Sequence, residues 1–479
     1  MSPRGLFLVL LLVGAAAAAL IWIKQASTVP IPVPSNQLET SLFPPTPQVT
    51  SDRAEVERLE QTVAHLEDQI KALTQENAQL LQKLGSIGMK NQPQPLPEKS
   101  AVPPKRAPDD YVALGLAIAK LRDLEPTPRP VVAASEEEAR AAAQRWLQKL
   151  HGADFGKREG VALHALGLIP EAVDTLEPRA LLLARQISGW YDEKSGTQLV
   201  IPPHNEPGGT QITTEPALAI AYGTLLSRFG DQLFGESFST LTSDERQARL
   251  ALLGGDAALI RFLYGITTPS AIDPKALPPD DPDHPLNQIP SPDFIRQRDL
   301  FSLTYGFEFA QTLHSANAWP GLTQAYARPP LTTAEIFDSE RYLNETNTAV
   351  PASKVEALAM PDDLWDDRLG QFALFYYLKR YMEPEAAHEA ASLWRGDRLI
   401  VIKGESRASA LWKIHAGSAD GAKKLHNAVH TAILNHYGLP ESTQLPHNGE
   451  RSLQISVEGE MVTLVDAESQ AAAQSLWQR

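Results

Sequence analysis

The residues whose spacing is most typical of a metal site are two histidines near the C-terminus. His426 and His430 stand at i and i+4 in KKLHNAVHTAILNHY, so they share one face of a predicted helix. A hydrolytic zinc helix also needs a carboxylate directly after its first histidine, and Asn427 stands there. Two histidines beside Lys423 and Lys424 are more typical of a solvated helix face, which is the interpretation we favour.

Other recognisable chemistries lack their motifs. His284 lies among aspartates in DDPDHP, but the spaced glycine and glutamate of a calcium loop are missing. The sequence has no phosphate-binding or dinucleotide glycine loop and no G-x-S-x-G elbow. It also has no cysteine, which excludes disulfides, thiolate zinc sites, iron–sulfur clusters and cysteine nucleophiles.

A series of short motifs runs from about residue 125 to the C-terminus. Residues 223–235, GTLLSRFGDQLFG, end like the helix of one kind of HExxH enzyme, yet they contain no histidine. The other motifs, in chain order, are ALGLI at 165–169, ISGWYDEKSGTQLVI at 187–201, GGDAALIRFLY at 254–264, YGFEFAQTL at 305–313, YARPPLTTAEIFDSERYL at 326–343, DDRLGQF at 366–372 and WRGDRLIVI at 394–402.

Together these motifs resemble, in order and spacing, a family of prokaryotic secreted or membrane-tethered HExxH zinc peptidases of the gluzincin type. In that family the corresponding patterns look like GFYD, HELxHALQDQxF, EGDA, Y-x-x-G-x-x-F, PPxST followed by HPExY, LGEF and WGGDR. The resemblance implies a zincin-like helical head. In such a head, two histidines at i and i+4 and a glutamate from a second helix bind one zinc ion, and the glutamate after the first histidine deprotonates the zinc-bound water.

The positions that the resemblance assigns to zinc and to catalysis hold other residues. Aligning the GDQLF tail places Gly223 at the first metal histidine and Thr224 at the catalytic glutamate. Ser227 falls at the second histidine, and Gly254 at the third ligand. Glycine offers no ligand, and hydroxyl groups are poor zinc donors without imidazole or thiolate company. The resemblance therefore implies an inactive peptidase-like head with no catalytic residue, no cofactor and no metal.

Small residues fill one face of this helix. They are Ala219, Gly223, Ser227 and Gly230, beside an apolar stripe of Leu218, Tyr222, Leu225, Phe229 and Leu233. A glycine inside a helix costs about 1 kcal/mol relative to alanine, so these glycines need a structural reason. We expect close packing, with the helix at 243–264 and its Gly254-Gly255 moving in; the alternative is a retained cleft that binds peptide without cutting it. We expect the other matching residues to make buried hydrogen bonds that hold the fold: Tyr191, Asp192, Asp231, Gln232 and Asp256.

The N-terminus predicts a membrane anchor. Residues 5–23 contain no charge and lie between Arg4 and Lys24, and about 20 apolar residues span a bilayer core. A cleaved signal peptide, the alternative, usually has a shorter apolar region of about 7–15 residues. The few residues before the anchor and the long acidic part after it favour export of the part that follows the anchor. We therefore expect a single-pass protein of the inner cell membrane, with its C-terminal head outside the cytoplasm.

A parallel coiled coil is predicted over residues 52–84, between proline-rich linkers at 24–51 and 85–110. Its seam consists of Val56, Leu59, Val63, Leu66, Ile70, Leu73, Asn77, Leu80 and Leu84. Residues that are mostly β-branched at a, leucine at d and a single asparagine at an a position favour a parallel homodimer. The alternative is one amphipathic helix packed on the head.

The remaining region, 111–479, predicts a mainly α (α+β) head with a small β-hairpin. Ser135 with Glu138, and Thr242 with Glu245, form capping boxes that open helices. Residues 267–293 predict a surface loop. RSLQISV-EG-EMVTLVD, residues 451–466, predicts two strands joined by a tight turn, followed by a short helix.

These expectations combine into one functional hypothesis. The net charge of −15 argues against nucleic acid as a partner. We expect a membrane-anchored, coiled-coil-dimerised, catalytically inactive metallopeptidase-like protein. Its head would be an extracytoplasmic binding or scaffold module for an unknown protein or peptide. The alternative is an active membrane-bound hydrolase or metallopeptidase that uses an unrecognised site.

Overall fold

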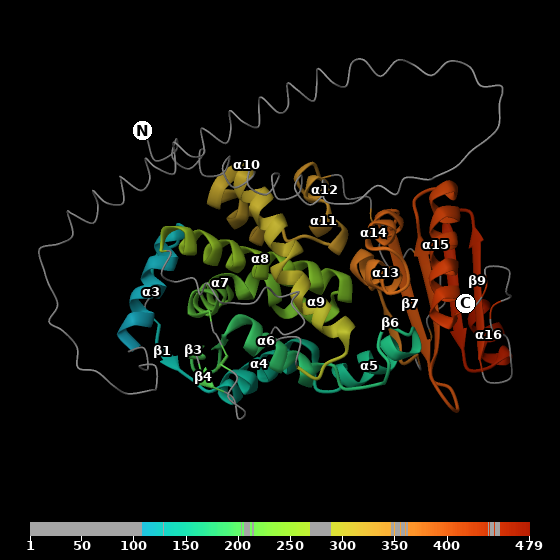
Figure 1. The fold of residues 1–479 in the computed structure, drawn as a ribbon, viewed down its shortest axis with the longest axis horizontal. Coiled ribbons are helices and arrows are strands. Elements are labelled where there is room, and N and C mark those ends of the chain that lie inside the picture. Colours follow the sequence, from blue (N-terminus) through green and yellow to red (C-terminus); the bar gives the residue numbers. More distant parts are fainter. Residues whose placement is uncertain are drawn as a thin grey trace, which may run out of the picture. The chain divides into compact units, whose positions relative to one another are not determined.

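The computed structural model describes residues 108–479, apart from 128, 203, 206–210, 213–214, 269–288, 346–348, 350–354, 356–359, 361–362, 439, 441–444 and 446–450. All described residues belong to one compact unit, Val102–Arg479. The predicted anchor at 5–23 and the coiled coil at 52–84 lie outside the described residues, as do the linker at 24–51 and most of that at 85–110. The described part is mainly helical, with small mixed and antiparallel sheets, as the α+β prediction required (Figure 1).

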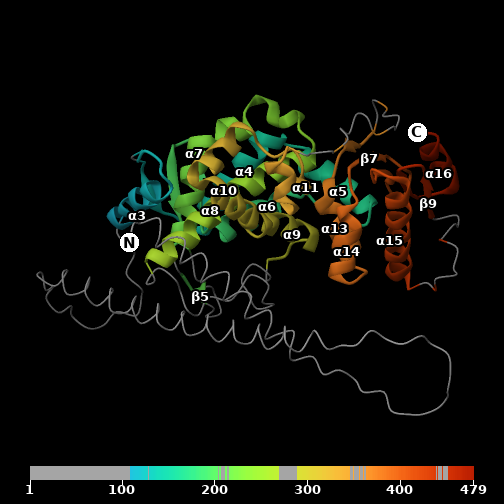
Figure 2. The ribbon, with the colours of Figure 1, turned by 90° about the horizontal axis from the view of Figure 1, so that it is seen from above.

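In the first part of the described chain, helices pack around one central helix, α8 (Ser243–Thr267). The other helices are α3 (Pro108–Leu121), α4 (Glu136–His151), α5 (Phe155–Ala165), α6 (Leu176–Ile187), α7 (Pro216–Phe234), α9 (Asp293–Leu303) and α10 (Tyr305–Ala327), with a 3-10 turn at Glu236–Thr240. Helix α8 packs against α7, α9 and α10 (Figure 2). Within the described residues, α8 alone is long and apolar enough to cross a membrane, but 61% of its apolar window is buried in the protein. A core helix shows this pattern.

Both predicted capping boxes are confirmed. At the start of α4, the Glu138 amide donates to Ser135 Oγ over 3.2 Å, and the Ser135 amide donates to Glu138 Oε2 over 2.7 Å. The same reciprocal pair between Thr242 and Glu245 opens α8. The predicted loop at 267–293 falls between α8 and α9, and most of it lies outside the described residues.

A three-stranded sheet covers one face of α7. Its strands are β1 (Val131–Ala133), β2 (Gly189–Asp192) and β3 (Thr197–Val200), in the order β1-β3-β2. Strand β1 runs parallel to β3, whereas β2 is antiparallel to it and pairs Tyr191 with Gln198. A separate two-stranded ladder joins β4 (His204–Asn205) to β5 (Gln211–Ile212). The three-stranded sheet positions side chains over the middle of α7.

The C-terminal part is built on a larger sheet than the sequence predicted. Five antiparallel strands are described there, β6 (Trp365–Asp367), β7 (Gly396–Ile402), β8 (Ser409–His415), β9 (Ser452–Glu458) and β10 (Met461–Ala467), in the order β6-β7-β8-β10-β9. The predicted hairpin, β9–β10, and the helix after it are confirmed. The sequence did not predict the other three strands of this sheet; β7 and β8 lack an alternating pattern. Both of their faces are covered, so their residues are buried almost continuously.

Further helices connect and cover this sheet. They are α11 (Thr333–Phe337), α12 (Ser339–Leu343), α13 (Gly370–Lys379), α14 (Pro384–Ser392), α15 (Ala419–Tyr437) and α16 (Gln470–Trp477). On one face, Ile400 and Leu411 form a cluster with Leu476 of α16. Elements α13 to α16 lie together with this sheet at one end of the described region, in orange and red (Figures 1 and 2).

Candidate functional site

The predicted metal and base positions on α7 have three different environments. Gly223 is buried, Thr224 is half-buried and Ser227 is exposed to solvent. The neighbouring apolar stripe is fully buried, as predicted, with Leu225 and Leu233 at 0% exposure. Ser227 therefore does not belong to the packed face of α7, although its spacing places it in the small-residue stripe.

Gly223 is covered by a side chain from the three-stranded sheet. A Cβ atom at this position would stand 1.6 Å from Gln198 Oε1 and 3.3 Å from Tyr191 Cβ. Gln198 is 2% exposed, and its Nε2 donates to the Leu199 carbonyl over 2.9 Å. Its Oε1 has no hydrogen-bond partner among the described residues and lies against the backbone of α7. In this arrangement, position 223 has room for glycine alone.

Gly254 faces other elements. A Cβ atom there would stand 2.8 Å from the Ser302 carbonyl oxygen at the end of α9. At the next residue, Gly255, a Cβ atom would stand 1.9 Å from the carbonyl oxygen of Gly306 in α10. Helix α8 packs against α7, as expected. The glycines themselves meet other elements: Gln198 covers Gly223, whereas α9 and α10 cover Gly254 and Gly255.

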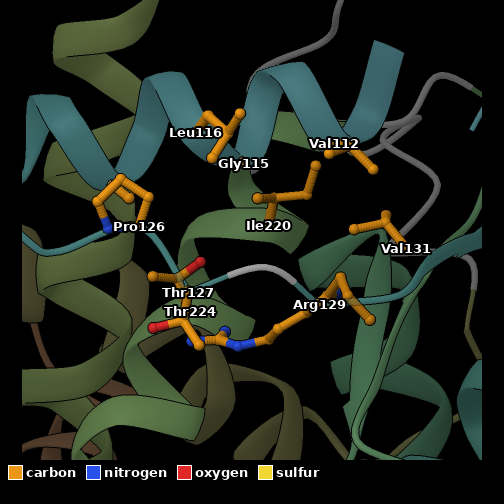
Figure 3. Close-up of a pocket in the computed structure, with 11 residues that line it drawn as sticks. Val112, Gly115, Leu116, Pro126, Thr127, Arg129, Val131, Ile220 and Thr224 are labelled. Carbon is orange, nitrogen blue, oxygen red and sulfur yellow. The ribbon is translucent and has the colours of Figure 1, made fainter. Parts of the chain in front are cut away.

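A small pocket, here called the Arg129 pocket, lies beside Thr224. It has a volume of about 40 Å³ and lies between α3, the segment before β1, and α7. Figure 3 shows the Arg129 guanidinium next to Thr224 and Thr127 at one end, with Leu116 and Ile220 on the apolar side. One polar end and apolar walls make a site for a group that is polar at its tip.

Arg129 brings a positive charge to this place. Its Nη1 donates to the Gly223 carbonyl over 3.1 Å, and its guanidinium lies 5.8 Å from the ring centre of Tyr191. Burial lowers the pKa of Arg129, and Tyr191 opposes this shift. Within the described part of the chain, no carboxylate forms an ion pair with it. Neither Arg129 nor Gln198 was predicted from the sequence; for Gln198, the available signal was a polar residue on the buried side of the strand TQLV.

The expectation of buried hydrogen bonds is confirmed for Asp256. It is fully buried and accepts hydrogen bonds from Arg122 Nε over 2.9 Å and from the Tyr326 hydroxyl over 3.1 Å. This cluster ties α3 and α10 to α8. The expectation was wrong for Asp231 and Gln232, which are exposed on the last turn of α7.

Tyr191 and Asp192, the last two residues of β2, are only half-buried. Asp192 accepts the Ser195 hydroxyl over 2.9 Å and forms an ion pair with Arg145 over 3.2 Å. Tyr191 packs beside Gly223 and Arg129. The contacts of Asp192 hold the turn after β2, and Tyr191 packs against α7.

Several of the later motifs meet in one buried polar network. Asp244 is fully buried, accepts the Thr333 amide over 2.8 Å and its hydroxyl over 2.6 Å, and lies 3.2 Å from Arg368 Nε. Burial raises the pKa of Asp244 to about 7. Gly370, with φ of +87°, passes so close that a Cβ atom would stand 1.9 Å from Asp244 Oδ1.

Asp397 accepts four hydrogen bonds, from the amides of Leu369 and Gly370 and from Nε1 of Trp394 and Trp412. The network joins α8 to the C-terminal sheet.

A larger polar pocket of about 390 Å³ lies between α5, the start of α8 and β6. His151 lines it, stacked on Phe155 with ring centres 4.4 Å apart. Burial and nearby arginines, including Arg246, hold the pKa of His151 well below its usual range. Asp367 accepts a hydrogen bond from the Ser243 hydroxyl over 2.6 Å, and burial raises the pKa of Asp367 to about 6. The described contacts include no hydrogen bond from His151 to either residue, so they assemble no nucleophile–histidine pair.

In the described part of the chain, no carboxylate forms an ion pair with the histidine pair on α15. The rings of His426 and His430 are nearly parallel, with centres 6.1 Å apart, and both residues are half-buried. His284 lies outside the described residues. Across the described residues, no group of three histidine, cysteine, aspartate or glutamate side chains is placed to hold a metal ion.

Residues 359–477 match a protein family described as a domain of unknown function (DUF8575). The match spans the five-stranded sheet with α13 to α16. No curated protein and no solved structure matches the chain. Helices α3 to α12, with Gly223, Gly254 and the Arg129 pocket, lie outside the matched segment.

Proposed function

We propose that this protein is a membrane-anchored, coiled-coil-dimerised and catalytically inactive relative of HExxH zinc peptidases, with a head that binds or scaffolds a protein partner outside the cytoplasm. The observation that carries the proposal is the position of Gln198. Its amide oxygen occupies the space that a side chain at position 223 would need. A zinc ion requires imidazole nitrogens at about 2.0–2.1 Å, and no ligand side chain reaches out from this place on α7.

The motif residues support the kinship through the contacts they make. Asp256 of the GGDA motif pairs with Arg122 inside the core, and the DDRLGQF and WRGDRLIVI motifs meet around Asp244 and Asp397. These are interactions that hold helices and sheet together. A chain that kept them while losing its ligand residues would keep the head folded and lose the reaction.

A second candidate is a hydrolase that works at the larger polar pocket. The pocket's volume is within the range of about 300–1,000 Å³ common for small-molecule sites, and it brings His151 and Asp367 to one cavity. Shifted pKa values at such a cavity are typical of functional sites. We favour the binding function, because no described hydrogen bond links His151 to a nucleophile.

The experiment for the proposed function is a cleavage assay with the full-length protein in detergent. Unstructured protein substrates should stay intact, with added zinc and with chelator alike. His151→Gln should also leave them intact. Cleavage that zinc supports and a chelator stops would refute the inactive head. Cleavage that is insensitive to metal and lost in His151→Gln would favour the second candidate.

A further inference from the structure

The Arg129 pocket carries a positive charge beside the two positions where the resemblance places a metal ligand and a catalytic glutamate. The Arg129 guanidinium reaches Gly223 from the segment before β1 and lies next to Thr224 (Figure 3). Its one hydrogen bond among the described residues goes to a backbone carbonyl, and a guanidinium has further N–H donors in a fixed fork. The charge is thus held in place without an anion beside it in the described part of the head.

Partial burial favours the binding of an anion beside such a charge. Burial lowers the pKa of Arg129, which is the direction expected of a cation removed from water without compensation. A bound anion would offset this cost. Apolar walls exclude competing water and strengthen the attraction between the two charges.

The size of the pocket limits the anion. Its volume is about 40 Å³, and one water needs about 10–15 Å³. A carboxylate, with one carbon and two oxygens, is small enough for such a space. Two apolar side chains of α3, Val112 and Leu116, line the same pocket and are 39% and 46% exposed. They offer a contact for an apolar residue that accompanies the carboxylate.

We propose that the Arg129 pocket binds one carboxylate carried by an apolar segment of a partner polypeptide. Arg129 would receive the carboxylate through its fork of N–H groups, and the Thr224 hydroxyl would donate a further hydrogen bond. The inference rests on the proposed function, because only an inactive head leaves a bound peptide uncleaved. The guanidinium attracts the ligand as a metal cation would, but it generates no hydroxide from water.

Three peptides test this proposal by calorimetry on the full-length protein in detergent. The first is an acetylated hexapeptide that ends in valine and leucine with a free C-terminus. The second is its C-terminal amide, and the third is an amidated hexapeptide with one glutamate between two leucines. At least one acidic peptide should bind roughly tenfold or more tightly than the neutral amide. Which of the two binds identifies the carboxylate as a chain terminus or a side chain.

Variants tie the binding to the pocket. Arg129→Gln should weaken it by roughly tenfold or more, and Arg129→Lys by less, since lysine keeps the charge without the fork. Arg249→Gln is the matched control, because Arg249 also donates to a carbonyl of α7, that of Leu233 over 2.8 Å, and burial also lowers its pKa, but it does not line the pocket. This control should stay within about twofold of the wild type.

The proposal is overturned if neither acidic peptide binds, if the neutral amide binds equally well, or if Arg129→Gln and Arg249→Gln have the same effect. Zinc content and peptide cleavage are measured on the same preparation. If the protein neither binds the acidic peptides nor carries zinc, only the proposed carboxylate site is overturned. If the protein binds zinc and cleaves the peptides, the proposed function is overturned as well.

Discussion

Gln198 Oε1 lies 1.6 Å from the place where a Cβ atom of residue 223 would stand. Strand β3 therefore touches the backbone of α7, and the glycine at 223 is a packing requirement of this sheet–helix contact. The relationship explains why a residue with poor helix propensity stands in the middle of a buried helix.

This contact predicts coupling between the two positions. Gly223→Ala should lower the free energy of unfolding by about 1–3 kcal/mol, because the glutamine amide must move. In a Gln198→Ala background the same change should be neutral, or stabilising by up to about 1 kcal/mol. Gly230→Ala on the same helix is the control, because its Cβ atom would meet only the flexible Leu226 side chain at 3.3 Å. Urea unfolding that ranks Gly223→Ala with Gly230→Ala would remove the packing explanation.

The buried pair of Arg122 and Asp256 predicts a large stability effect. Both side chains are 0% exposed, so Arg122→Met leaves an unpaired carboxylate in the core. This change should cost about 3–5 kcal/mol. Arg140→Met breaks the ion pair with Glu137 on the surface of α4 and should cost less than about 1 kcal/mol. Equal losses in urea unfolding would contradict the role assigned to the buried pair.

Asp244 predicts a specific pH dependence. Burial raises its pKa to about 7 in the folded head, against about 3.9 in an unfolded chain. Its contribution to stability is therefore complete below about pH 4 and is lost as the pH rises through about 7. The unfolding free energy of the wild type, measured relative to Asp244→Asn, should fall across this range by on the order of a few kcal/mol. Asp231→Asn, at an exposed site on α7, is the control for the replacement of an aspartate by asparagine. Parallel curves for the wild type and Asp244→Asn would contradict the shift.

The coiled coil remains a prediction, because residues 52–84 lie outside the described part. A chain that begins at Ser51 should be dimeric in light scattering, whereas one that begins at Asp109 should be monomeric. Asn77→Ile should raise the melting temperature and broaden the range of oligomers, because an asparagine at an a position of a coiled coil sets register at a cost in stability. Equal masses for the two truncated chains would remove the coiled coil from the account.

Local sequence signals predicted the elements that local physics determines. The capping boxes at Ser135 and Thr242 mark helix starts because their hydrogen bonds span only three residues. The β9–β10 hairpin follows from two apolar runs around Gly459, whose φ is +56°. Strands β7 and β8 escaped prediction because burial on both faces removes the alternation that identifies a strand.

The candidate site was predicted in position but not in its contacts. Spacing from the GDQLF tail placed Gly223 and Thr224 on α7, and both lie there. The side chains that face them, Gln198 and Arg129, come from segments separated in the sequence and are brought there by the β1–β3 pairing. Exposure also differs along one helical stripe, so Ser227 faces solvent while Gly223 is buried. Such long-range contacts leave no periodic trace in a single sequence.

We propose that α7 and α8 do not form a zinc site. The most direct test of this proposal is the zinc content of the full-length protein as purified, with the melting temperature measured with and without chelator. A zinc ion bound only to the native state would stabilise it by mass action, so removing it would lower the melting temperature. We expect far less than one zinc per chain and the same melting temperature in both conditions. One zinc per chain, removed by chelator with a drop in melting temperature, would contradict it.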